Sequence, residues 1–359
     1  MNYKIEPNKG PAYLQIYDQI KKEIVAGSYA YNKKLPSKRL LCEETGVSII
    51  TVEHAYDLLI EEGYVESKER SGYFVSFRPS DGFASSRAYS PFHPHPIAHA
   101  TTSFPFSVLA RSMRRVLSDY GEALLEKAPN AGFEELRKAL ASYLHRNRDI
   151  VVDPSQIVIG SGADYLYGLS VELLGRERVY GIESPSYKKI EQVYRAENVR
   201  YEPLPLTSDG IDSFFLAQTT ASVLHVSPYR SYPTGVTASA SKRHEYVRWA
   251  FSGNRYLIED DFESEFSLSP KAEDTLYSLS DGERVIYLNT FSQTISPSLR
   301  IGYMVLPKSL VGVFEDKLGF YSCTVPTYEQ YLLTDLLESG AFERHINRVR
   351  RARRKSSLS

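Results

Sequence analysis

The chain has 359 residues, a formal net charge of -1 and 42% hydrophobic residues. This length allows two or three domains with cores of their own, and the balanced charge excludes a protein that is basic throughout, although a local DNA-binding face stays possible. Two isolated cysteines, Cys42 and Cys323, are too few for a disulfide framework or a zinc cluster and suit a reducing compartment, so we predict a cytoplasmic protein. No apolar run reaches the about 20 residues of a membrane span, and we expect no contact with a membrane.

Residues 1–78 have the pattern of a small helical module that ends in a β-hairpin. Apolar residues at helical spacing predict a first helix after Pro11. Ser37 can cap a second helix, which runs from Lys38 to about residue 45, and Ser48 can cap a third. The two β-rich segments that follow are residues 64–66 and 73–75. Helix, helix, turn, helix and hairpin is the order of a winged helix-turn-helix.

The same module resembles the GntR family of bacterial transcription factors. The resemblance rests on Leu35-Pro36-Ser37-Lys38-Arg39, on Gly46-Val47-Ser48 and on Arg70-Ser71-Gly72-Tyr73, at fixed spacings within residues 10–77. It implies that the protein binds double-stranded DNA. The residues that we expect to contact DNA are Lys38 and Arg39 at the start of the second helix, Ser48 and Thr51 at the amino end of the recognition helix, and Lys68 and Arg70 in the wing.

Two positions depart from the GntR pattern. Ile49 stands where an arginine is usual, and Glu53 where a basic residue is frequent. Residues 1–78 hold 8 Lys and 3 Arg against 2 Asp and 9 Glu, so the module carries no net charge. Because phosphate contacts supply much of DNA affinity, we expect one module to bind weakly and a homodimer to be needed.

Residues 79–103 have the composition of a linker, rich in Pro, Ser, His and Ala and without periodicity. An alternative interpretation of this segment is a metal-binding tract, formed by His93, His95 and His99. A Pro-rich linker offers no rigid ligand geometry, so we predict no metal site there.

Residues 104–359 are predicted to form an α/β domain. Short apolar runs alternate with helical patterns, which indicates a mostly parallel sheet with helices on both faces. The predicted strands are residues 156–159, 178–182, 223–226, 256–258, 285–288 and 300–306. Ligands of such sheets bind at the carboxyl ends of the strands.

The stretch from Thr290 to Tyr303, Thr-Phe-Ser-Gln-Thr-Ile-Ser-Pro-Ser-Leu-Arg-Ile-Gly-Tyr, is similar to the cofactor segment of fold-type I pyridoxal-phosphate (PLP) enzymes. Together with the winged helix, it resembles the MocR-type regulators, in which a GntR module is fused to an aminotransferase class I-like domain. The resemblance implies a PLP cradle. The residues that would hold the PLP phosphate are Ser161, Gly162 and Ala163, in the turn after the predicted strand 156–159, together with Thr290, Ser292 and Arg300. The PLP ring would stack on Tyr187, and its nitrogen would pair with Asp260.

Three departures argue against catalysis. Gln293 replaces the lysine whose amine forms the Schiff base, and an amide nitrogen is not a nucleophile. Phe262 replaces a tyrosine whose hydroxyl reaches the cofactor in the family. The chain ends at Ser359, where relatives continue into a small domain that carries a substrate-binding arginine. Lys189 is the remaining position that the resemblance assigns to a ligand carboxylate.

The interpretation is a DNA-binding transcriptional regulator, a GntR-type winged helix with a degenerate, C-terminally incomplete aminotransferase-like domain that senses a small molecule, dimerises, or does both. PLP, bound without a covalent bond, is the predicted cofactor or effector. Two alternatives stay open: a PLP-dependent aminotransferase in which another lysine replaces Gln293, and a dimerisation module that binds no small molecule.

Overall fold

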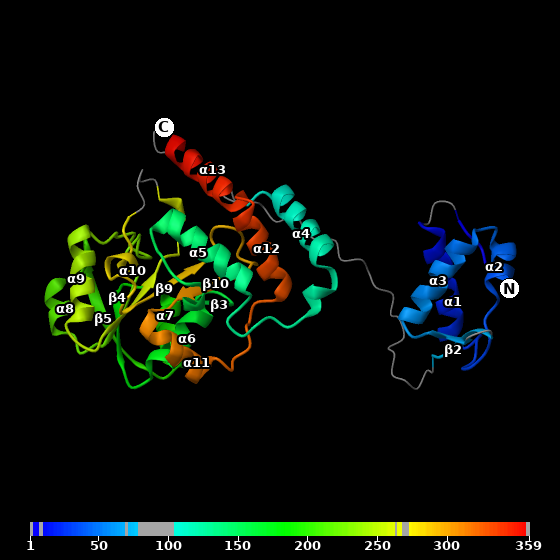
Figure 1. Cartoon of the computed structure of the whole chain (residues 1–359), viewed down its shortest axis with the longest axis horizontal. Coiled ribbons are helices and arrows are strands. Elements are labelled where there is room, and N and C mark those ends of the chain that lie inside the picture. Colours follow the sequence, from blue (N-terminus) through cyan, green and yellow to red (C-terminus); the bar gives the residue numbers. More distant parts are fainter. Residues whose placement is uncertain are drawn as a thin grey trace. The chain divides into compact units, whose positions relative to one another are not determined.

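The computed structural model describes residues 3–6, 10–68, 71–77, 104–262, 264–267 and 273–356. The chain divides into two compact units, Met1–Ile97 and Ala98–Ser359 (Figure 1). The predicted linker at 79–103, with its histidines, and the predicted wing residue Arg70 lie outside the described residues. None of the described helices is long and apolar enough to cross a membrane.

The first unit is a three-helix module with a two-stranded antiparallel hairpin, as the sequence predicts. Its elements are α1 (Ala12–Val25), α2 (Lys38–Thr45), α3 (Ile49–Glu61), β1 (Val65–Lys68) and β2 (Gly72–Val75). The Ser37 side chain accepts a hydrogen bond from the backbone N–H of Leu40, and the Ser48 side chain one from that of Thr51, so both predicted caps are formed. Gly46 ends α2 in the left-handed conformation, with φ at +69°.

One apolar core holds this unit together. Ile16 and Ile20 of α1 pack on Val52 and Leu59 of α3, and Val75 of β2 closes the core; all five side chains are fully buried. The buried apolar residues of α1 and α3 recur every three or four positions, so one face of each of these helices packs in the core and the opposite face lies outside it.

The second unit is built on a mixed eight-stranded sheet in the order β3-β10-β9-β8-β7-β4-β5-β6. The strands are β3 (Ile157–Gly160), β4 (Val179–Ser184), β5 (Arg200–Thr207), β6 (Gly210–Ile211), β7 (Val223–Val226), β8 (Tyr256–Asp260), β9 (Val285–Thr290) and β10 (Gly302–Val305). The pairs β4–β5, β4–β7, β7–β8 and β8–β9 are parallel, so the predicted mostly parallel core is present. Strand β10 runs antiparallel to both β3 and β9.

Strand β5 is an element that the sequence prediction missed. It contains Pro203 and Pro205, and proline weighs against a strand because it lacks the N–H that a ladder needs. The structure accommodates both prolines because β5 lies next to the two-residue strand β6 at one edge of the sheet.

Helices cover both faces of the sheet (Figure 1). The helices of this unit are α4 (Phe106–Tyr120), α5 (Glu134–Arg148), α6 (Ala163–Leu174), α7 (Lys188–Ala196), α8 (Ser213–Gln218), α9 (Ala240–Phe251), α10 (Leu276–Leu279), α11 (Lys308–Leu318), α12 (Thr327–Glu338) and α13 (Ala341–Ser356), with short 3-10 turns at Gly121–Leu125, Pro154–Gln156 and Ser264–Phe266. Helices α6, α7 and α11 share one core with Ile286 and Leu288 of β9, whereas α5, α9, α12 and α13 share the other with Val285 and Tyr287. Successive residues of β9 thus point to opposite faces.

A buried ion pair ties the end of α5 to Asp261, the residue that follows β8. Arg148 Nη2 lies 2.6 Å from Asp261 Oδ2, with 8% and 2% of their side chains exposed, and the Tyr287 hydroxyl donates to the same oxygen at 2.6 Å. Removing the arginine would leave a buried carboxylate without its counter-charge.

Arg148→Met is therefore expected to lower the free energy of unfolding of this unit by about 3–5 kcal/mol. Arg146→Ala is the control in the same helix, because Arg146 pairs with Glu343 while 52% exposed, and it should cost at most about 1 kcal/mol. Urea denaturation followed by tryptophan fluorescence measures both. Equal losses in the two variants would contradict this account of the buried pair.

Candidate functional site

A cavity of about 420 Å³ opens at the carboxyl ends of the central strands. This volume lies within the range of about 300–1,000 Å³ that is usual for small-molecule sites. Its lining residues are Ala163, Asp164, Tyr167, Tyr187, Lys189, Ser227, Tyr232, Asp260, Phe262, Thr290, Ser292, Gln293, Pro297 and Arg300. Ten positions are predicted from the sequence to form the cofactor and ligand site, and eight of them, including Gln293 and Lys189, line this one cavity.

The sheet topology explains this convergence. Asp260 ends β8 and Thr290 ends the parallel neighbour β9, so both reach the same edge. Strand β10 runs the other way, and its first residue, Gly302, pairs with Thr290 on one side and with Gly160 on the other. Arg300, two residues before this strand, is thereby placed between the turn after β3 and the segment after β9.

Asp260 is a buried acceptor with one oxygen in use. Its side chain accepts a hydrogen bond at Oδ2 from the Tyr167 hydroxyl, and His225 Nε2 lies 3.9 Å from the same atom. Burial and the Asp260 charge raise the pKa of Tyr167 well above its ordinary value, so its hydroxyl stays a donor. Asp260 Oδ1 has no hydrogen-bond partner among the described residues, which fits a ligand that brings a ring N–H to this point.

The turn after β3 is shaped to bring Arg300 against the amino end of α6. Gly162 precedes the helix with φ at +94°, and a Cβ added there would lie 2.8 Å from Nη2 of Arg300. A side chain at this position would strain the backbone and would displace that guanidinium, whose Nη2 also donates to the Ser161 carbonyl at 3.4 Å. The Ser292 hydroxyl is buried and has no partner among the described residues. Backbone N–H groups at a helix start, an arginine and a hydroxyl are the groups that hold phosphate, so these residues fit PLP.

Two predicted cradle residues do not line the cavity. Gly162 acts through the space that it leaves for Arg300, and Ser161 uses its backbone N–H to donate to Thr324 Oγ1 at 3.1 Å. That N–H is therefore engaged within the protein.

Asp164 is a charged lining residue that the sequence prediction missed. Its carboxylate forms an ion pair with Arg300 through Oδ1, and its Oδ2 lies 3.6 Å from Nζ of Lys189. The predicted phosphate-binding arginine and the predicted carboxylate-binding lysine thus meet on one acidic side chain. The position was visible next to Ala163, but an acidic residue in a first helical turn is usually explained by the helix dipole.

Tyr167 was also missed, although its spacing pointed to it. Residues 163, 164 and 167 lie on one face of α6, because positions three and four apart are neighbours on a helix. Tyr187 and Tyr232, whose rings meet edge to face with centroids 5.8 Å apart, add aromatic surface to the cavity.

Gln293 follows β9 and is solvent exposed at the cavity. Phe262 lines the same cavity without a polar group. Lys189 is the only lysine among the lining residues that the structure describes. Among the described residues no group of three or more His, Cys, Asp or Glu side chains is arranged to hold a metal ion.

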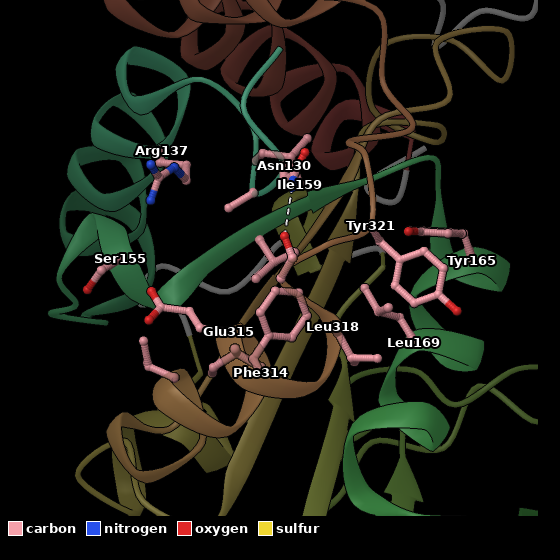
Figure 2. Close-up of a pocket in the computed structure, with 15 residues that line it drawn as sticks. Asn130, Arg137, Ser155, Ile159, Tyr165, Leu169, Phe314, Glu315, Leu318 and Tyr321 are labelled. Atoms are coloured by element: carbon pink, nitrogen blue, oxygen red, sulfur yellow. Dashed lines mark hydrogen bonds between the residues drawn. The ribbon is translucent and has the colours of Figure 1, made fainter. Parts of the chain in front are cut away.

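A second cavity, of about 240 Å³, lies among β3, α6 and α11 (Figure 2). Two of its polar residues serve the fold: Asn130 Nδ2 donates to the Gly319 carbonyl at 2.7 Å, and Arg137 Nη1 to the Pro154 carbonyl at 3.0 Å. Most other lining side chains are apolar, Phe314 and Leu318 among them. This cavity therefore offers packing space and no convergent set of polar groups.

The basic side chains that we expect to contact DNA differ in whether they already form an ion pair within the protein. Lys38 Nζ lies 2.5 Å from Glu53 Oε1 of α3, so the acidic departure from the family pattern neutralises the predicted lysine. Arg39 is exposed, and within the described part of the chain it has no ion pair. Lys68 pairs with Glu66 at 2.9 Å and donates to Asn32 Oδ1 at 3.0 Å.

The amino end of α3 presents hydroxyls and apolar side chains. The Ser48 and Thr51 hydroxyls lie 2.8 Å apart and hydrogen-bond to each other. Ile49 and Ile50 are 49% and 73% exposed, and neither belongs to the core. Exposed methyl groups on a recognition helix can contact the thymine methyl in the major groove.

Comparisons with known proteins agree with both units. Residues 12–75 match the model of bacterial regulatory proteins of the gntR family, and residues 100–357 match that of aminotransferases of class I and II. The uncharacterized HTH-type transcriptional regulator YdeL of Bacillus subtilis is 32% identical over 96% of this chain and 77% of its own length. The chain belongs to the MocR-type GntR family of regulators. The probable rhizopine catabolism regulatory protein MocR of Rhizobium meliloti is 28% identical over 95% of this chain and 74% of its own length.

The second unit has the fold of the PLP-binding aminotransferases. An archaeal alanine:glyoxylate aminotransferase matches 67% of this chain with a TM-score of 0.61 at 24% identity, a likeness that concerns the fold. The chain spans 62% of that enzyme's length. The chain thus combines this fold with a GntR module, as the sequence predicts.

Proposed function

We propose that this MocR-type protein is a cytoplasmic, DNA-binding transcriptional regulator whose aminotransferase-like unit binds PLP, or a related amino-acid-like molecule, without a covalent bond. The observation that carries the proposal is a cavity that is lined by most of the predicted cradle residues and has Gln293, not a lysine, in its lining. Asp260 would accept from the ring, Tyr187 would stack on it, and Arg300 with Ser292 would hold the phosphate.

The same residues argue against transamination. Bound PLP acts as an electron sink, but the reaction also needs an amine that forms and exchanges the covalent link and moves a proton at the substrate carbon. The Gln293 amide does neither, and Phe262 offers no proton. What the cavity residues supply is binding and orientation of a ligand, which is what a sensor needs.

A homodimer is the proposed form. A single GntR module without net charge is expected to bind DNA weakly, and two modules on paired half-sites bind much better. Large apolar side chains on the second unit, such as Leu125 at 87% and Phe320 at 71% exposure, support a partner surface there. Light scattering at micromolar concentration tests this, and a stable monomer that still binds DNA tightly would contradict it.

A DNA-binding titration tests the regulatory role. Duplexes selected from a random pool by the purified chain would be bound in the presence of increasing PLP, with pyridoxine as the control molecule that lacks phosphate and aldehyde. We expect the DNA affinity to change in one direction and to saturate with PLP. A DNA affinity that no PLP concentration changes would exclude the sensor and leave the second unit as a scaffold.

A further inference from the structure

Asp164 places a negative charge where the ligand phosphate is expected. The Arg300–Asp164 ion pair and the 3.6 Å approach of Lys189 put one carboxylate between the two cations of the cavity. The three side chains are 38–49% exposed, so the contacts stand at the open side of the cavity rather than in the core. Asp164 is also in the first turn of α6, at the helix end that would receive the phosphate.

We propose that Asp164 is an internal competitor for the ligand phosphate and thereby a specificity-determining residue of this cavity. The inference rests on the proposed function, because it concerns the same ligand site. In the absence of ligand the carboxylate neutralises Arg300 and Lys189. A phosphate that enters must break this pairing and then lies beside a carboxylate of the same sign.

The charge state of Asp164 supports this role. Burial alone would raise its pKa, but the charge of Arg300, a hydrogen bond from its own backbone and the charge of Lys189 outweigh burial, and the net pKa is below the ordinary value. The carboxylate is therefore ionised at neutral pH. It uses an arginine, a lysine and a helix N–H group, the same kinds of donor that a phosphate would use.

The consequence is selectivity by charge. With Asp164 ionised, the three side chains carry a net charge of about +1, which suits a carboxylate better than a phosphate of charge near −2. Phosphate is then held more weakly than by a cradle without an acidic residue. Weak and reversible binding lets occupancy follow ligand concentration, whereas tight binding would keep a sensor permanently filled.

The test compares PLP with pyridoxal, which has the same ring and aldehyde but no phosphate. Asp164→Asn should bind PLP about fivefold more tightly than the wild type, as loss of a partly exposed charge pair implies, and its affinity for pyridoxal should be unchanged. Glu172→Gln is the matched control, since Glu172 lies on the same helix as Asp164 and pairs with Arg176, which follows that helix; neither Glu172 nor Arg176 lines the cavity. It should change neither affinity.

A double variant tests whether Asp164 weakens PLP binding through Arg300. If Asp164 acts by holding Arg300, then Arg300→Gln should cost more PLP affinity in the Asp164→Asn background than in the wild type. Asp164→Ser serves as a second variant, and circular dichroism checks that each variant is folded. PLP affinity that is unchanged or weaker in both Asp164 variants would overturn the inference.

Inorganic phosphate separates this inference from the proposed ligand. The melting temperature of Asp164→Asn should rise with phosphate more than that of the wild type, whether or not the cavity accepts a pyridine ring. If no variant bound PLP or pyridoxal while this difference held, the proposed ligand would be wrong and the role of Asp164 would stand. If pyridoxal bound, but the response to phosphate and the affinity for PLP were the same in all variants, the proposed ligand would stand. The role of Asp164 as a competitor for phosphate would then be excluded.

Discussion

Gln293→Lys is expected to turn reversible PLP binding into a covalent bond that borohydride reduction fixes on residue 293. Gln293 lines the same cavity as Ser292 and Asp260, and its amide nitrogen is not a nucleophile that could attack the aldehyde. The predicted readout is a shift of the absorbance spectrum that survives dialysis, together with a peptide mass that carries the reduced adduct. This is the largest expected change of any single substitution in the cavity, because it adds a bond that the wild type lacks.

Gln293→Met is the control for that experiment, since it has a similar length and no amine. It should bind PLP no more durably than the wild type. Transamination should stay slow in Gln293→Lys, because Phe262 still offers no hydroxyl to the ligand. A folded Gln293→Lys variant that takes up no PLP would show that the cavity is not a PLP site.

Arg39→Ala is expected to weaken DNA binding by about 1–3 kcal/mol if the guanidinium contacts a base edge, and to lower the salt slope by about one unit if it contacts only a phosphate. Arg39 is exposed at the start of α2 and has no ion pair within the described part of the chain. Its side chain therefore reaches DNA without first leaving an acidic partner.

Lys38→Ala is the matched comparison, one residue away on the same helix. Lys38 is held 2.5 Å from Glu53, so its contribution to DNA binding is already reduced, and its replacement should cost less than that of Arg39. Binding isotherms at several salt concentrations distinguish the two. If Arg39→Ala and Lys38→Ala together left DNA binding unchanged, the predicted orientation of α2 on DNA would be wrong.

Local rules were enough to predict the first unit. The caps Ser37 and Ser48, the left-handed glycine after α2 and the apolar stripe of α3 all act within a few residues, so a sequence reports them directly. The fold class of the second unit was also predictable, because buried parallel strands contain short apolar runs such as residues 285–288 of β9, a strand in which all six residues are buried.

Contacts between distant residues could not be predicted. Arg300 and Asp164 are 136 residues apart, and their pairing depends on the antiparallel placement of β10 between β3 and β9. Motif comparison assigned Arg300 to a phosphate and gave no sign of the carboxylate beside it. Likewise, Lys38 pairs with Glu53 only because α2 and α3 pack on one core. In both cases charge neutralisation across the fold changes the role that a local motif predicts.

Borohydride reduction of the wild-type protein with PLP tests the central claim most directly. The chain would be incubated with PLP, reduced, digested and analysed by mass spectrometry, and a parallel sample would be dialysed without reduction. We predict saturable PLP binding that dialysis removes, with no lysine modified in stoichiometric amount. A stoichiometric reduced adduct on Lys189, the lysine of the cavity lining, or on any other native lysine would contradict non-covalent binding and favour an aminotransferase with a relocated amine.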